Sequence, residues 1–152
     1  MHPDVSFKND LRELLESQKL AVLATRTEGS PHGSLVSFAA APDMKAILFA
    51  TTRSTRKYVN LTREPHVTLV IDNRENAARD LHKAMALTVK GRAEEVPPED
   101  LQGCLAVYLR KHPYLKGFVS SPTCALVRVR VETYSLVRRF QEVTEISLEG
   151  CE

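Results

Sequence analysis

Three basic side chains fall within five residues of this sequence, at Arg53, Arg56 and Lys57. The stretch 51–57 also contains four hydroxyl residues, and neither aspartate nor glutamate occurs between residues 46 and 63. An apolar run ends at residue 50 and an amphipathic pattern resumes at Tyr58 and Leu61, so we expect a strand to pass into a helix here. The first turn of a helix has unpaired N–H groups and a partial positive charge, which disfavour cations unless an anion is bound. The sequence therefore predicts a phosphate site, with a solvated basic patch as the alternative.

Other motifs for catalysis or metal binding are absent from the sequence. It has no GxxxxGK[ST] or GxGxxG loop for a nucleotide, and no HExxH or GxSxG motif for hydrolysis. Cys104, Cys124 and Cys151 are too widely spaced for a CxxC pair, so we expect neither a zinc site nor a disulfide framework. Cys104 and Cys124 are expected to fill small apolar spaces, and Cys151 to be a tail thiol. Free thiols are typical of a reducing cytosol, so a cytoplasmic location is expected.

Composition places the chain among ordinary globular proteins. Of its 152 residues, 43% are hydrophobic and 26% are charged, which suits one domain with its own core. The formal net charge of +2 is too small to indicate binding to nucleic acid. No apolar run is long enough to span a membrane, and the charged N-terminus does not resemble a signal peptide, so no membrane partner is expected.

The spacing of apolar residues predicts six or seven strands and three helices. Phe7, Leu11, Leu14 and Leu15 repeat at helical spacing, whereas the valines at 127, 129 and 131 alternate with charged residues as in a half-buried strand. The expected strands are 19–27, 34–41, 46–52, 66–72, 85–96, 124–136 and 142–148. Helices are expected within 1–18, over 55–63 and from residue 97, while 73–84 is a loop or a short helix and 111–123 an irregular connection.

The links between the first three strands are of hairpin length, and parallel pairing would need longer crossovers. We therefore expect a mainly β fold (α+β by its count of elements): an antiparallel six- to seven-stranded barrel with peripheral helices. Gly91 is expected at a bulge or a close approach of the backbone. The chain forms a single domain in this interpretation, with an N-terminal helix in 1–18, a barrel core that carries the phosphate site in 19–96, and a helix and closing strands in 97–152.

The order of motifs resembles one known family. The segments "LATRTEGSPHGSLVSFA", "ILFATTRSTRKYVNLTREPHVTLVI" and "LTVKGRAEEV" follow one another between residues 20 and 96. They are similar to the pattern of the FMN-binding split β-barrel superfamily, whose best-known member is pyridoxamine 5'-phosphate oxidase. The block of hydroxyls before Arg-Lys, followed by Asn-Leu and a proline, is the most specific part. The resemblance implies a split barrel, homodimeric, with FMN in the groove between the subunits.

The resemblance also implies roles for particular residues. Arg56 and Lys57 match the pair that grips the FMN phosphate, and residues 34–37 match the strand beside the ribityl chain and the flavin ring. The strand start that holds Ala86 would be supplied by the partner subunit. The implied cofactor-binding residues are Ser34, Leu35, Val36, Ser37, Thr51, Thr52, Thr55, Arg56, Lys57 and Ala86.

The half of the family pattern that binds the oxidase's substrate has no match here. Ala39 stands where the oxidase has a lysine, its Tyr-x-x-x-Arg-x-x-x-Ser block is missing, and the chain has no tryptophan for its C-terminal block. We therefore expect an FMN-dependent oxidoreductase that acts on a different small molecule. A non-catalytic flavin or haem carrier, a redox sensor and a deazaflavin-dependent reductase are the alternatives. A nucleic-acid-binding barrel is a fourth, which the small net charge disfavours.

A second stretch, 108–118, mixes aromatic and basic residues and is expected at the mouth of the flavin groove, with a solvated loop as the alternative. Phe118 or Tyr114 is the candidate to stack on a ring, and Lys111 or Lys116 to meet an anionic substrate. Arg138 and Arg139 raise the same question at the end of the long strand. The histidines are expected to be solvated at 32, 82 and 112 and structural at 66.

Overall fold

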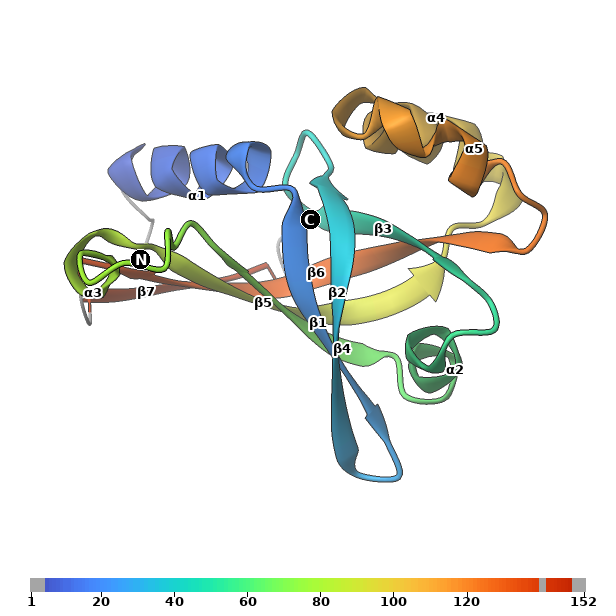
Figure 1. Cartoon of the computed structure of the whole chain (residues 1–152), viewed down its shortest axis with the longest axis horizontal. Helices are drawn as coiled ribbons and strands as arrows, with labels where there is room; N and C mark the ends of the chain where they lie inside the picture. Colours follow the sequence, from blue (N-terminus) through green and yellow to red (C-terminus); the bar gives the residue numbers. More distant parts are fainter. Residues whose placement is uncertain (1–4, 140–141, 149–152) are drawn as a thin grey trace.

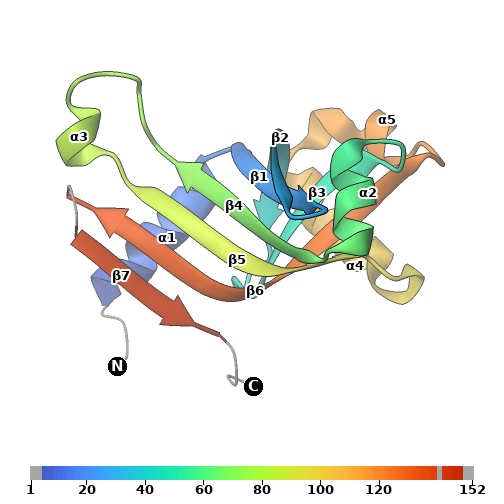
Figure 2. The ribbon, with the colours of Figure 1, turned by 90° about the horizontal axis from the view of Figure 1, so that it is seen from below.

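Seven antiparallel strands form one sheet in the order β3-β2-β1-β4-β5-β6-β7, and a further pairing of β3 with β6 closes the first six into a barrel (Figures 1 and 2). The computed structural model describes residues 5–139 and 142–148. The strands are β1 Leu20–Thr27, β2 Ser30–Ala40, β3 Ala46–Thr52, β4 His66–Asp72, β5 Ala86–Glu95, β6 Cys124–Arg138 and β7 Glu142–Ser147. The helices are α1 Val5–Ser17, α2 Arg56–Arg63, α3 Asp80–Lys83, α4 Pro98–Lys111, the 3-10 helix η1 Pro113–Leu115, and α5 Lys116–Val119. The predicted antiparallel barrel is confirmed.

Alternate side chains of the strands point into the barrel and form its core. Val127, Val129 and Val131 of β6 are buried, as their alternation predicted. The four predicted apolar residues of α1 are all buried in the same cluster, and Leu61 of α2 joins it. Gly91 lies where the β5–β6 register shifts, and a Cβ there would overlap the carbonyl oxygen of Arg130. The bulge expected at Gly91 is therefore confirmed.

A second apolar cluster lies on the outer face of the barrel under α4. Tyr108 packs there against Ala39, Leu48 and Leu126, which point away from the barrel interior. Leu101, in the first turn of α4, is exposed and does not belong to this cluster. The connection 111–123 is more regular than expected, since η1 and α5 occupy most of it. No helix of the described residues is long and apolar enough to cross a membrane.

Strand β2 changes partner along its length, and this splits the barrel wall. Residues 30–37 pair with β1, whereas residues 38–40 pair with β3. The strand begins at Ser30, four residues earlier than expected, because the turn needs only Glu28 and Gly29, both with positive φ. Pro31 is tolerated in it because the edge of β2 that faces β3 is unpaired there. The unpaired edge opens a wedge between β2 and the end of β3.

Candidate functional site

The junction between β3 and α2 is held together by its own hydroxyls. Thr55 is the N-cap of α2, and its Oγ1 accepts a hydrogen bond from the Tyr58 N–H at 3.3 Å. The same Oγ1 lies 2.8 Å from the Oγ1 of Thr51, which is itself almost fully buried. The cap fixes the direction of α2, so that the N–H groups of its first turn lie beside the end of β3.

Arg53 is balanced by an acid that the local sequence does not contain. Its Nε and Nη2 donate to the two carboxylate oxygens of Glu95, at the end of β5, at 3.2 Å and 2.8 Å. The Tyr58 hydroxyl donates to the same carboxylate at 2.6 Å, and Nη1 of Arg53 donates to the carbonyl oxygen of Pro122 at 2.9 Å. The Arg53 hydrogen bond is the main cause that holds the pKa of Glu95 below its usual value. Of the three cations, only Arg56 and Lys57 form no ion pair within the described residues.

A cavity of about 400 Å³ lies in the wedge between β2 and the end of β3. Lys57 and the hydroxyl residues of the junction line one end of it, and the β2 segment that was expected beside the flavin lines a side. The α4 end and the η1–α5 segment complete the wall. The lining residues are Leu35, Val36, Ser37, Ala50, Thr51, Thr52, Thr55, Lys57, Tyr108, Leu115 and Phe118.

Seven of the ten residues expected to bind a cofactor therefore lie together, and three lie elsewhere. Ser34 is adjacent in β2, and its Oγ is buried with no hydrogen-bond partner among the described residues. Arg56 is exposed on the first turn of α2 and does not line the cavity. Ala86 pairs with Asp72 and Val137 on another part of the sheet, so in this single chain it is separate from the cavity.

The cavity also receives backbone groups from the unpaired edge of β2. The Phe38 N–H donates to the carbonyl oxygen of Lys19, on the β1 side of the strand. Because successive residues of a strand direct their N–H and C=O groups to opposite edges, those of Leu35 and Ser37 face the other way, toward the wedge. This edge presents both donors and acceptors at fixed spacing, which suits a flat heterocycle with polar groups along its rim.

Tyr108 and Leu115 lie in the stretch 108–118 that was expected at the mouth of the groove, but neither was named there as a candidate contact. The Tyr108 hydroxyl donates to the Ser37 carbonyl oxygen at 3.0 Å. Burial raises the pKa of Tyr108 to about 12, so the hydroxyl stays neutral. Nothing local in the sequence identifies this contact, because the two residues are 71 positions apart. Phe118, one of the two aromatic candidates, does line the cavity, whereas Tyr114 is exposed outside it.

Lys111, the last residue of α4, and His112, which follows it, do not lie where they were expected. Lys111 turns away from the cavity: its Nζ donates to the Leu15 carbonyl oxygen at 2.8 Å and lies 3.8 Å from the centroid of the Phe38 ring. Burial lowers the pKa of Lys111 to about 8. His112 is fully buried rather than solvated, with Nε2 2.7 Å from the Phe38 carbonyl oxygen and Nδ1 3.0 Å from the Tyr114 hydroxyl. Since a carbonyl can only accept, Nε2 carries the proton; burial lowers the pKa of the ring and keeps it neutral.

Other candidates lie outside the cavity. Lys116 is exposed, and Arg139 occupies an exposed turn. Arg138 is buried and its guanidinium is paired with Asp10 at 2.9 Å and Glu142 at 3.2 Å, which joins α1 to the end of the sheet. Cys104 and Cys124 are half-buried, and Cys151 lies outside the described residues.

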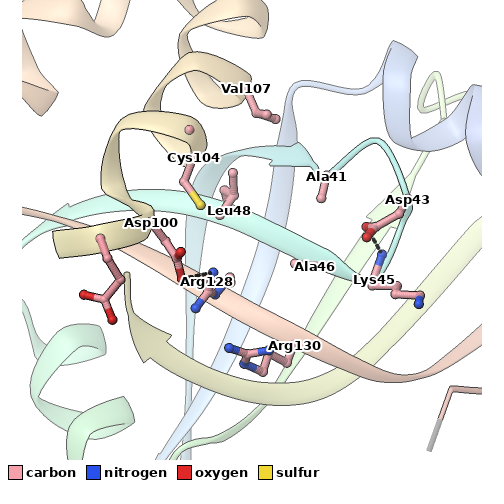
Figure 3. A pocket seen from close by; sticks show the side chains of 12 residues that line it. Ala41, Asp43, Lys45, Ala46, Leu48, Asp100, Cys104, Val107, Arg128 and Arg130 are labelled. Carbon is pink, nitrogen blue, oxygen red and sulfur yellow. Dashed lines mark hydrogen bonds and ion pairs between the residues drawn. The ribbon is translucent and has the colours of Figure 1, made fainter. Parts of the chain in front are cut away.

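A larger hollow, of about 530 Å³, lies at the N-terminal half of α4 (Figure 3). The guanidinium of Arg128 borders it and points toward Asp100 of α4, at 3.2 Å. Glu94 accepts from Arg128 at 2.8 Å and from Arg130 at 2.8 Å. These charges are largely matched within the chain and attach α4 to the sheet. The cavity in the wedge, whose lining holds the cation Lys57 and no acidic residue, is therefore the better candidate for an anionic ligand.

Comparison with solved structures shows where this fold recurs. A heme binding protein from Mycobacterium smegmatis superimposes with a TM-score of 0.84 at 20% identity; the match covers 98% of this chain and 60% of that one. A protein from Clostridium acetobutylicum related to general stress protein 26 gives 0.75 at 19% identity, over 97% and 98% of the two chains. A FAD-binding protein from Mesorhizobium loti gives 0.68 at 14%, over 85% and 90%. At these identities the likeness establishes the fold alone.

The sequence itself decides the family. No curated protein matches the chain. The family model described as pyridoxamine 5'-phosphate oxidase, however, matches residues 7–138, from the first turns of α1 to the end of β6. That range contains the whole barrel, the split in β2 and every residue that lines the wedge. The chain belongs to the pyridoxamine 5'-phosphate oxidase family.

Proposed function

We propose that this chain is an FMN-binding flavoprotein and an oxidoreductase that acts on a small molecule other than pyridoxamine phosphate. One observation carries the proposal: Lys57 and the first turn of α2 border the same cavity as the unpaired edge of β2. A phosphate fits the cation and N–H groups of α2, and the polar rim of a flavin fits the unpaired edge of β2. The residues present thus suit FMN, and the volume of the cavity lies within the usual range for cofactor sites.

When bound, FMN supplies the hydride chemistry, so the chain needs no nucleophile of its own. The residues of the wedge bind and orient the cofactor. Lys57 neutralises the phosphate, the cap at Thr55 aims the N–H groups of α2, and the edge of β2 sets the position of the ring. The Tyr108 hydroxyl donates to the Ser37 carbonyl oxygen. The N–H groups of Leu35 and Ser37 therefore remain as the donors of this strand edge to the flavin ring.

FMN is favoured over haem by the chemistry of the lining. The Mycobacterium structure is described as heme binding, so haem is the second candidate. Haem iron is usually held by histidine or cysteine, sometimes by methionine or tyrosine. Among the residues that line the wedge, the structure has no histidine, cysteine or methionine, and the Tyr108 hydroxyl is already bonded to the backbone.

A second copy of the chain would complete the site. Leu35 and Val70 are exposed, by 67% and 36%, and each lies directly opposite Val22 on a neighbouring strand. With Leu20, which is 55% exposed, they form an apolar row on the outer face of β2, β1 and β4. Contiguous apolar surface of this kind is typical of an interface. We propose that a partner copy covers this row and supplies its Ala86 to the flavin.

The test is the visible spectrum and ligand binding of the purified protein. Flavin absorbance, with release of FMN on heating, is the expected result, together with tighter binding of FMN than of FAD, a deazaflavin or haemin in calorimetry. If the purified protein binds none of the flavins in calorimetry, the proposal of a flavoprotein is refuted. Flavin binding without turnover by NADH, NADPH or artificial electron acceptors would instead identify a carrier or a sensor.

A further inference from the structure

The cavity in the wedge has two chemically different ends. The first is the polar end, with Lys57 and the threonines. The second, which we call the aromatic end, consists of Tyr108, Leu115 and Phe118. Lys57 is the only charged residue among those that line the cavity in the described chain, and it belongs to the polar end. The aromatic end therefore carries no charge of its own.

The charged and titratable groups close to the aromatic end are directed elsewhere. Lys111 donates to the last turn of α1, and His112 is buried and bonded to the backbone of β2. The hydroxyl of Tyr108 is neutral and donates to the Ser37 carbonyl oxygen. Lys116, on α5, is exposed to solvent and does not line the cavity. A charged substrate placed at this end would lose hydration without gaining a partner.

The aromatic end instead offers flat apolar surface. Phe118 is 41% exposed although it is a large aromatic side chain, and Leu115 is half-buried beside it. Ser37, on the β2 side of the same cavity, has a hydroxyl with no hydrogen-bond partner in the described chain. Burial of an apolar ring against this surface is favourable, and one hydroxyl is enough to orient it.

We infer that the aromatic end is a subsite for an uncharged, flat, largely apolar molecule. The inference rests on the proposed function, since it assigns the remaining end of the cavity once FMN occupies the polar end and the edge of β2. It sets this chain apart from the oxidase that gives the family its name, whose substrate carries a phosphate.

The experiment compares two probes of nearly the same shape, 2-naphthamide, which is neutral, and 2-naphthoate, which is an anion. Each is titrated into the FMN-loaded protein and followed by the anisotropy of naphthalene fluorescence. We expect 2-naphthamide to bind at least about tenfold more tightly, because only the anion must be desolvated without a partner. Equal or tighter binding of 2-naphthoate would overturn the inference and point to Lys116 as the group that meets the substrate.

Phe118→Ala locates the subsite, and Leu81→Ala is its control. Phe118→Ala should weaken 2-naphthamide about tenfold, because it removes an apolar wall, and leave FMN affinity within about threefold. Leu81 is equally apolar and 64% exposed but lies on α3, away from the cavity, so its replacement should change neither affinity. An unchanged affinity for 2-naphthamide in Phe118→Ala would refute the subsite. Failure of the protein to bind FMN is a separate result, which refutes the proposed function before any probe is added.

Discussion

Arg56 and Lys57 are neighbours in the sequence, but the structure predicts that only one of them grips a phosphate. Lys57 is half-buried and lines the cavity, whereas Arg56 is exposed and is not among the residues that line it. Replacing each with alanine should therefore separate a direct contact from a distant charge. The matched pair also keeps the helix intact, because alanine is the best helix former.

The expected losses differ in size and in their dependence on salt. A hydrogen bond to a charged group contributes about 1.5–3 kcal/mol, so Lys57→Ala should weaken FMN binding by about 10- to 150-fold. An exposed charge contributes about 0–1 kcal/mol, so Arg56→Ala should cost about fivefold at most. Because salt screens exposed charges within about 10 Å at 0.1 M, the small effect of Arg56→Ala should vanish in 0.5 M NaCl while most of the effect of Lys57→Ala persists.

Quenching of flavin fluorescence gives the affinities, and riboflavin is the control ligand because it lacks the phosphate. In the unchanged protein FMN should bind more tightly than riboflavin, and in Lys57→Ala this preference should largely disappear. Lys57→Met retains much of the apolar stem and should behave like Lys57→Ala if the charge is what matters. The reasoning fails if Arg56→Ala and Lys57→Ala lose equal affinity, or if Lys57→Ala weakens riboflavin as much as FMN.

Three further predictions concern stability, each measured by urea unfolding. Gly91→Ala should destabilise the fold by about 1–3 kcal/mol or more, because a Cβ there overlaps Arg130. Gly103→Ala is the control: it adds a Cβ in open space on α4 and should stabilise the fold by about 0.5–1 kcal/mol. A Gly91→Ala protein as stable as the parent would contradict the close packing of β5 on β6. Tyr108→Phe should cost about 0.5–1.5 kcal/mol, because the Ser37 carbonyl oxygen loses its donor, and no loss would mean that this bond is dispensable. Burial lowers the pKa of His112, so below pH 6.5, its ordinary pKa, the unfolded chain binds a proton more readily than the folded one. The free energy of unfolding should therefore fall as the pH drops below 6.5, by at most about 1.4 kcal/mol per pH unit. His112→Gln should remove this part of the slope, and identical slopes between pH 7.5 and 5 would refute it.

Local patterns were enough to predict most of the barrel. Strand β4 and helix α2 begin and end within a residue of their expected positions, because alternation, the cap at Thr55 and the proline after α2 are all signals within a few residues. The start of β2 was misplaced for a physical reason. Pro31 and two glycines suggest a long turn, but only Glu28 and Gly29 adopt turn geometry, and an unpaired strand edge accepts the proline.

The contacts that define the site connect residues far apart in the sequence, so local patterns could not reveal them. The absence of acids near Arg53 suggested a bound anion, yet Glu95, 42 residues away, supplies the counter-charge. The same limit explains Lys111 and His112: their segment is polar in sequence, but the end of α4 places both against β2 and α1. What the sequence did identify was the cluster of hydroxyl and basic residues at 51–57, because its members are neighbours in the chain.

The change of partner along β2 connects the fold to the proposed chemistry. In a closed barrel every strand edge is paired, whereas here the N–H and C=O groups of Leu35 and Ser37 face the wedge because β3 meets β2 only at residues 38–40. In the free chain water must form hydrogen bonds to these groups, except at the Ser37 carbonyl oxygen, which accepts from the Tyr108 hydroxyl. A ring whose rim carries donors and acceptors would replace that water at fixed positions. At the other side of the cavity, Glu95 and the Pro122 carbonyl oxygen bind Arg53 and so fix the loop that leads into α2. The cofactor would then complete both the sheet edge and the helix terminus, so its binding should raise the thermal midpoint, and increasingly so as the FMN concentration exceeds its dissociation constant.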